Sequence, residues 1–198
     1  GKSYLTFAIQ YFLTEIKKIP CQIFGLDLKE DVIDYCNKLC KKLNCDYLSF
    51  QTGDIETYSS KQNAHIIITL HACDTATDFA LKYAIQKQAK VILSVPCCQH
   101  QVNSSLNKNN TDSLFEPLLK WGIIKEKFAS LVTDSLRGQW LEAQGYNVQM
   151  LEFIDMEHTP KNILIRAVKK DDSKNCSSKK EAATQLIQSL KITQELWK

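Results

Sequence analysis

Strand-like and helix-like segments alternate along this 198-residue chain, and this alternation constrains the fold more than any other feature of the sequence. Apolar residues recur at the helical period in three segments, which predicts helices at 4–17, 29–43 and 75–88. Short apolar runs lie between and after them and predict strands at 21–28, 47–55, 64–70 and 90–95. The run at 64–70, AHIIITL, is apolar throughout, as expected of a strand covered on both faces.

The last third of the chain departs from this alternation. A helical region at 114–144, broken near Trp121, is followed by Gly145 at a position typical of a helix C-cap. Two strand-like segments then follow at 146–154 and 161–168. The turn between them is short enough for an antiparallel hairpin.

These elements predict an α/β fold with a Rossmann-like, mostly parallel sheet, helices on both faces, and a C-terminal antiparallel hairpin that places one reversed strand at an edge. We expect this domain to span residues 1–169. Residues 170–198 are predicted to form a charged linker and a terminal helix with no core of its own.

The composition is that of a soluble globular protein, with 44% hydrophobic and 24% charged residues and no apolar run long enough to cross a membrane. The eight cysteines do not follow the spacing of a disulfide scaffold, and the chain shows no secretory signal. We therefore expect reduced thiols and a cytoplasmic location. The net charge of +3 permits an RNA partner without requiring one.

Ligands of such sheets bind at the carboxyl ends of the strands, so the residues that follow the strands are the candidate site. Asp27 lies about 26 residues after Gly1, a separation at which a nucleoside-binding acid receives two ribose hydroxyls. The alternative is an N-cap for the helix that begins at Lys29. Asp54 and Ile55 follow the next strand and suit an adenine amine and the adenine ring, and the alternative is a plain tight turn.

The opening residues Gly1, Lys2 and Ser3 fit two kinds of nucleotide site. They match the end of a P-loop, which would make the chain an NTPase. They also match the glycine turn after the first strand of a Rossmann-like sheet. Acids at two successive strand ends fit an adenosine better than a triphosphate, so the P-loop is the weaker alternative.

Two further strand ends carry sulfur and imidazole groups, in the segments LHACDTATD and VPCCQH. If their strands are neighbours, they bring together His71, Cys73, Asp74, Cys97, Cys98 and His100. With GKSYLTFA, GLDLK and EHTPKN, these segments resemble the class I S-adenosylmethionine-dependent methyltransferases. LHACDTATD and CCQH are also similar to the H-x-C-G-x-A-T-D and CCHH segments of a tRNA 2′-O-methyltransferase family.

The resemblance, which spans residues 1–169, implies a cofactor site and a transfer site. The residues that would bind S-adenosylmethionine are Gly1, Asp27, Asp54 and Ile55. The residues that would line the transfer pocket are His71, Asp74, Cys97, Cys98 and His100. In this family a first strand and most of the glycine turn precede the position of Gly1, so we expect the given residues to belong to a longer protein.

His71 is the candidate base that deprotonates the methyl acceptor, with Asp74 orienting it or the acceptor. The alternatives are a histidine bonded to backbone and an aspartate that caps the following helix. The turn EHTPKN is a candidate substrate-side element through His158, Lys161 and Asn162, against ordinary turn chemistry.

The set of Cys73, Cys97, Cys98 and His100 invites a zinc site. We nevertheless expect no metal, because adjacent cysteines without a C-x-x-C pair make an awkward chelate and packing explains these thiols adequately.

RNA is the favoured acceptor through the resemblance rather than through charge. Lys125, Lys127 and Arg137 are candidate phosphate contacts, and the alternative is a solvated helix face. The alternative from another class is a catalytically silent Rossmann-like module that keeps the cofactor pocket and recruits a partner through the terminal helix.

Overall fold

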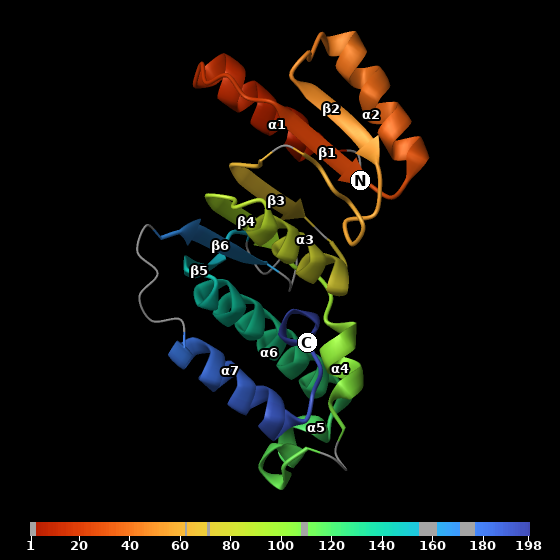
Figure 1. The fold of residues 1–198 in the computed structure, drawn as a ribbon. Helices are drawn as coiled ribbons and strands as arrows, with labels where there is room; N and C mark the ends of the chain where they lie inside the picture. Colours follow the sequence, from red (N-terminus) through yellow and green to blue (C-terminus); the bar gives the residue numbers. More distant parts are fainter. Residues whose placement is uncertain (1–2, 62, 71, 108–110, 155–161, 171–176) are drawn as a thin grey trace. The chain divides into compact units, whose positions relative to one another are not determined.

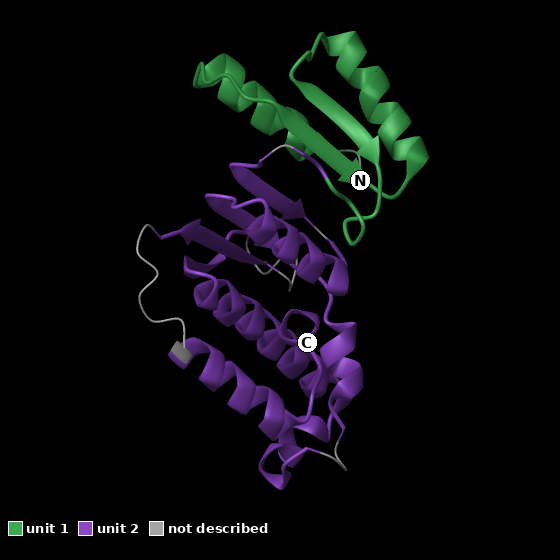
Figure 2. Cartoon of the chain, in the orientation of Figure 1, with its two compact units in different colours: residues 1–59 green, residues 60–198 purple. Residues whose placement is uncertain are grey.

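The computed structural model describes residues 3–61, 63–70, 72–107, 111–154, 162–170 and 177–198. The chain divides into two compact units, residues 1–59 and residues 60–198, which are called unit 1 and unit 2 below (Figure 2).

Unit 1 is a parallel pair of strands with helices packed against it (Figure 1). α1 (Tyr4–Tyr11) continues into a π-helical turn, η1 (Phe12–Ile16), and the chain then enters β1 (Ile23–Asp27). α2 (Glu30–Leu43) leads the chain to β2 (Leu48–Thr52), which pairs with β1 in parallel. These bounds confirm the helices and strands predicted for this part of the chain.

The core of unit 1 forms between β2 and the inner face of α2. Its buried residues are Ile33, Cys36, Cys40, Leu48 and Phe50. The two cysteines in this core therefore act as small hydrophobic side chains. Leu43, the last residue of α2, is 55% exposed, because α2 ends there and Asn44 turns the chain in a left-handed conformation, with φ 52°.

Gly25 in β1 is a position at which this core has no room for a side chain. A Cβ at Gly25 would lie 2.3 Å from Cδ1 of the Phe50 ring. We expect Gly25→Ala to lower the free energy of unfolding of unit 1 by about 1–3 kcal/mol, the usual cost of overpacking.

Gly122→Ala is the control for this substitution, because no atom lies within 4 Å of a Cβ at Gly122. Urea unfolding and hydrogen exchange of the β1 amides measure the effect in both variants. Equal protection of β1 in the two variants would contradict the prediction.

Unit 2 carries the rest of the strand–helix alternation and the hairpin (Figure 1). Its described strands are β3 (Ile66–Leu70), β4 (Val91–Val95), β5 (Tyr146–Glu152) and β6 (Ile163–Lys169). Its described helices are α3 (Thr75–Gln86), α4 (His100–Ser105), η2 (Ser113–Phe115), α5 (Glu116–Leu119), α6 (Gly122–Ala143), α7 (Ser177–Leu190) and η3 (Glu195–Trp197). Over the residues that the structure describes, none of the helices combines the length and the apolar character that crossing a membrane requires.

The strands of unit 2 form a sheet in the order β3-β4-β6-β5. β3 and β4 run parallel, whereas β6 is antiparallel to both β4 and β5. The predicted parallel strands and C-terminal hairpin are confirmed, but the prediction of a reversed strand at an edge is wrong. The second strand of the hairpin, β6, is the one that pairs with β4, which leaves β5 outermost.

β3 also differs from its prediction as a strand covered on both faces. Ile66, Ile68 and Leu70 are exposed, whereas Ile67 and Thr69, which point to the other face, are half-buried. β3 is an end strand of the unit 2 sheet, and only the face that carries Ile67 packs against the core of this unit.

Two buried clusters hold unit 2 together. The first lies between the sheet and helices α3 and α6, and includes Leu81, Ile92, Leu141, Tyr146 and Ile165. The second joins α4, α6 and α7, and includes Val102, Leu136, Ala183 and Leu190. Nε1 of Trp197 also donates to the carbonyl oxygen of Leu136 at 3.2 Å. The terminal helix, expected to have no core of its own, therefore shares the core of unit 2.

Candidate functional site

Asp27 is the last residue of β1, so its carboxylate lies at the carboxyl end of the parallel pair in unit 1. Oδ1 accepts the backbone N–H of Lys29 at 3.0 Å, and the residue is half-buried. The N-cap position of α2 is Lys29, so Asp27 is not the cap that the alternative interpretation proposed. Because a carboxylate has about four acceptor sites, Asp27 suits a ligand with paired hydroxyl groups.

Asp54 and Ile55 follow β2 at the same edge of the pair. The backbone N–H of Gly53 donates to the carbonyl oxygen of Asp27 at 3.1 Å, which ties the two strand ends together. Oδ1 of Asp54 accepts the N–H of Glu56 at 3.0 Å, so the predicted tight turn is present. This turn leaves Asp54 exposed and Ile55 half-buried. Unit 1 therefore presents two acids and an apolar side chain at successive strand ends.

In unit 2, the parallel pairing of β3 with β4 confirms that LHACDTATD and VPCCQH end neighbouring strands. Asp74 has φ 50° and ψ −117°, a conformation that residues with a side chain rarely adopt. Its Oδ2 accepts the backbone N–H of Gln101 at 3.0 Å, so the segment before α3 is joined to the first turn of α4. Asp74 occupies the N-cap position of α3, yet its side chain makes no capping hydrogen bond. Backbone strain of this kind clusters at functional sites.

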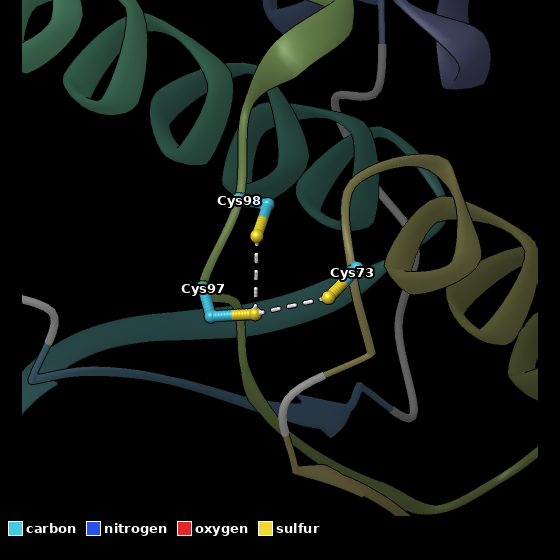
Figure 3. Close-up of side chains that lie close together, drawn as sticks. All are labelled: Cys73, Cys97 and Cys98. Atoms are coloured by element: carbon cyan, nitrogen blue, oxygen red, sulfur yellow. Dashed lines mark hydrogen bonds between the residues drawn. The ribbon is translucent and has the colours of Figure 1, made fainter.

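The thiols of Cys73, Cys97 and Cys98 point toward one another (Figure 3). Sγ of Cys97 lies 3.7 Å from Sγ of Cys73 and 3.5 Å from Sγ of Cys98. Burial, with the hydrogen bonds and charges of Cys98 and Cys73, raises the pKa of Cys97 to about 12. Cys97 is therefore not an activated thiolate in the structure as it stands.

The remaining predicted site residues lie apart from the thiol cluster or outside the described residues. His100 is the first residue of α4 and is exposed. Asn162 is buried, and its Nδ2 donates to the carbonyl oxygen of Ile154 at 2.8 Å, so its side chain closes the base of the hairpin. The predicted site residues that lie outside the described residues are Gly1, His71, His158 and Lys161.

A buried ion cluster in unit 2 was not predicted from the sequence. Arg137 of α6 is fully buried and donates to Oδ1 of Asp78 at 2.7 Å, to Oδ1 of Asp134 at 3.1 Å and to the carbonyl oxygen of Asp74 at 2.8 Å. The prediction that Arg137 contacts RNA phosphates is therefore wrong, because its guanidinium is enclosed and paired. The spacing of Asp134 and Arg137, three residues apart on a helix, is the signal that could have indicated a pair.

Comparisons with known proteins found a family model, a relative and similar solved structures. The model of the family described as "Methyltransferase domain" matches residues 1–105. A protein from Bos taurus, described as "Glutathione S-transferase C-terminal domain-containing protein", is 24% identical over 169 residues. That match covers 75% of this chain and 26% of the bovine protein, so the chain spans only about a quarter of its relative's length.

Two solved structures are also similar. A putative methyltransferase from Streptococcus mutans in complex with SAH has a TM-score of 0.52 and 13% identity, with 85% of this chain and 84% of that chain covered. A putative rRNA-methylase from Clostridium thermocellum has a TM-score of 0.49 and 17% identity, with 87% and 83% covered. The first likeness confirms the Rossmann-like α/β fold. The family match covers more than half of the chain, including β1 to β4 and the strand-end residues that follow them, and the chain accordingly belongs to the methyltransferase domain family.

Proposed function

We propose that this chain transfers a methyl group from S-adenosylmethionine to RNA. Membership of the methyltransferase domain family supports the reaction type. The observation that carries the cofactor assignment is the pair of acids, Asp27 and Asp54, at the ends of two neighbouring parallel strands. The Streptococcus mutans protein of similar fold is in complex with SAH, which is the product of such a transfer.

The residues of unit 1 fit this cofactor in their chemistry. The Asp27 carboxylate suits the two hydroxyls of a ribose, and the exposed Asp54 carboxylate suits an exocyclic adenine amine. Ile55, half-buried in the same turn, offers an apolar surface for the ring. S-adenosylmethionine supplies a methyl group on an activated sulfonium, so the protein has to align the acceptor, accept its proton and exclude water.

We assign these tasks to the residues that follow β3. Asp74 has a carboxylate held by the Gln101 amide and a strained backbone, which suits a group that orients its neighbours. His71 directly follows β3 in the sequence and is assigned as the base. In a methyl transfer from bound S-adenosylmethionine, His71 would take the proton that the acceptor loses.

RNA as the acceptor is supported by the similarity of LHACDTATD and CCQH to a tRNA methyltransferase family and by one exposed surface. Trp121 is 60% exposed, and Nζ of Lys120 lies 5.1 Å from the centre of its ring. Lys127 is exposed on the same helical region. An accessible indole beside one lysine, with a second exposed lysine on the helix that follows, suits stacking of an unpaired base together with phosphate contacts.

Asp27→Ala in the full-length protein should weaken the binding of S-adenosylmethionine by about 1–3 kcal/mol, the range for losing hydrogen bonds to a charged group. Asp46→Ala is the matched control, because Asp46 is exposed and precedes β2, at the opposite end of the strand pair. Titration calorimetry on both variants measures the difference. Unchanged affinity in a folded Asp27→Ala protein would remove Asp27 from the cofactor site.

The acceptor is tested with labelled S-adenosylmethionine and separate pools of cellular RNA and protein. The proposal expects label in RNA and less label with Trp121→Ala. Label in the protein pool alone would overturn the RNA acceptor and keep methyl transfer. Cofactor binding without transfer to either pool would favour the silent module.

A further inference from the structure

The three thiols of Cys73, Cys97 and Cys98 form a cluster whose geometry has a use beyond packing. Their sulfur atoms all lie within 4.8 Å of one another, and two of the separations are 3.7 Å and 3.5 Å. The cluster is built from two elements: Cys73 follows β3, and Cys97 and Cys98 follow β4 (Figure 3). Because β3 and β4 pair in parallel, both segments leave the same edge of the sheet.

These separations match those of sulfurs that share a metal ion. A zinc–thiolate bond is about 2.3 Å long, so two sulfurs on a tetrahedral zinc lie about 3.8 Å apart. Small movements of three side chains would therefore bring the sulfurs around one ion. Cys73 is exposed and Cys97 and Cys98 are half-buried, so an ion can reach the cluster from solvent.

A disulfide bond accounts for the closeness of the three thiols less well than a shared metal ion does. Cα atoms of adjacent residues lie about 3.8 Å apart, below the usual range of about 4.4–6.8 Å for bonded cysteines. That spacing disfavours a bond between Cys97 and Cys98. A bond between Cys73 and Cys97 would leave the thiol of Cys98, 3.5 Å away, without a role.

The expectation of no metal considered Cys73, Cys97, Cys98 and His100 together, and it rested on the adjacency of Cys97 and Cys98, which makes an awkward chelate. The structure places beside them a third sulfur from a residue 24 positions earlier in the chain, and three ligands from two loops make a far better site than two adjacent ones. The sequence placed Cys73 near Cys97 and Cys98 on the condition that their strands are neighbours, and the parallel pairing of β3 with β4 fulfils this condition.

We propose that Cys73, Cys97 and Cys98 bind one Zn²⁺ ion as three thiolate ligands. Among the described residues the cluster contributes these three ligands, so the fourth coordination position is taken by water or by a ligand from outside the cluster. Zinc sites with three protein ligands and an open position are of the kind that activates a bound group. The ion also links the segment that carries Asp74 to the segment that leads into α4.

The test uses the reduced full-length protein, titrated with Zn²⁺ against a chromophoric chelator and with Co²⁺ as a spectroscopic substitute. We expect one equivalent of either metal and sulfur-to-cobalt charge-transfer absorption. Loss of second-shell partners costs about 10–100-fold in metal affinity, so each ligand variant, Cys73→Ser, Cys97→Ser or Cys98→Ser, should lose at least about 100-fold.

Cys21→Ser and Cys45→Ser are the matched controls, because both residues lie in unit 1, outside the cluster, and are half-buried like Cys97. They should bind zinc as the unaltered protein does. Circular dichroism checks that each variant is folded. Cys73 is exposed, so Cys73→Ser should fold and can still test the zinc site if a variant at a more buried cysteine unfolds. Absence of stoichiometric binding in the reduced protein, or binding that Cys73→Ser leaves intact, would overturn the zinc site.

Discussion

Arg137→Met should lower the free energy of unfolding by about 3–5 kcal/mol, the usual cost of removing one partner of a buried ion pair. Arg137 is fully buried, and its guanidinium donates to Asp78, Asp134 and the carbonyl oxygen of Asp74. Methionine fills a similar volume but leaves two carboxylates without their cation. Urea unfolding, followed by circular dichroism, measures the loss.

The loss in this variant should depend on pH. Burial raises the pKa of Asp78, and the charge of Arg137 opposes this in part. With a raised pKa the folded state holds the proton more tightly than the unfolded state, so this contribution to stability decreases as pH rises from about 4. Removing Arg137 raises the pKa of Asp78 further. Arg137→Met should therefore lose more stability at pH 7.5 than at pH 5.

Two further variants separate this explanation from a simple packing defect. Adding Asp78→Asn to Arg137→Met removes an uncompensated charge and should restore part of the stability. Arg166→Met is the matched control, because Arg166 is exposed on β6 and pairs with Gln149, and it should change stability by no more than about 0.5 kcal/mol. A pH-independent loss in Arg137→Met, with no recovery in the double variant, would contradict the charge argument.

The sequence predicted most of the fold because the elements of unit 1 and unit 2 carry their own periodic signals. Helix α2 and the strands around it follow from an apolar stripe and two short apolar runs. Strand order carries no such local signal. The position of β6 between β4 and β5 depends on which strand of the hairpin reaches β4, so a prediction from hairpin spacing placed the reversed strand at the edge.

The candidate site likewise contains residues that the sequence could locate and residues that it could not. Asp27, Asp54 and Asp74 could be located because residues at strand ends are recognisable once the strands are known. Arg137 was misassigned because a charged side chain on a helix is usually exposed, and its burial depends on Asp78, 59 residues earlier. The meeting of Cys73 with Cys97 was expected only if their strands are neighbours, a condition that the pairing of β3 with β4 confirms. The periodic pattern of apolar residues carries no information about contacts between segments that are distant in the sequence.

His71→Ala is the variant with the largest expected effect on activity. As the assigned base, His71 should contribute roughly 10²–10⁴-fold to the rate of single-turnover methyl transfer, the usual range for a positioned acid–base group. The affinity for S-adenosylmethionine should stay nearly unchanged, because the acids assigned to the cofactor, Asp27 and Asp54, are not altered. Single-turnover transfer to RNA and titration calorimetry on the same preparation measure the two quantities.

His65→Ala is the matched control for this variant. His65 is exposed and directly precedes β3, whereas His71 directly follows it, so the two residues lie at opposite ends of one strand in the sequence. The backbone carbonyl of His65 accepts the N–H groups of Lys90 and Val91, and alanine keeps these bonds. His65→Ala should therefore transfer methyl groups at the unaltered rate. A histidine with only a structural role at position 71 would lower stability and cofactor affinity together, and full transfer by His71→Ala would exclude His71 as the base.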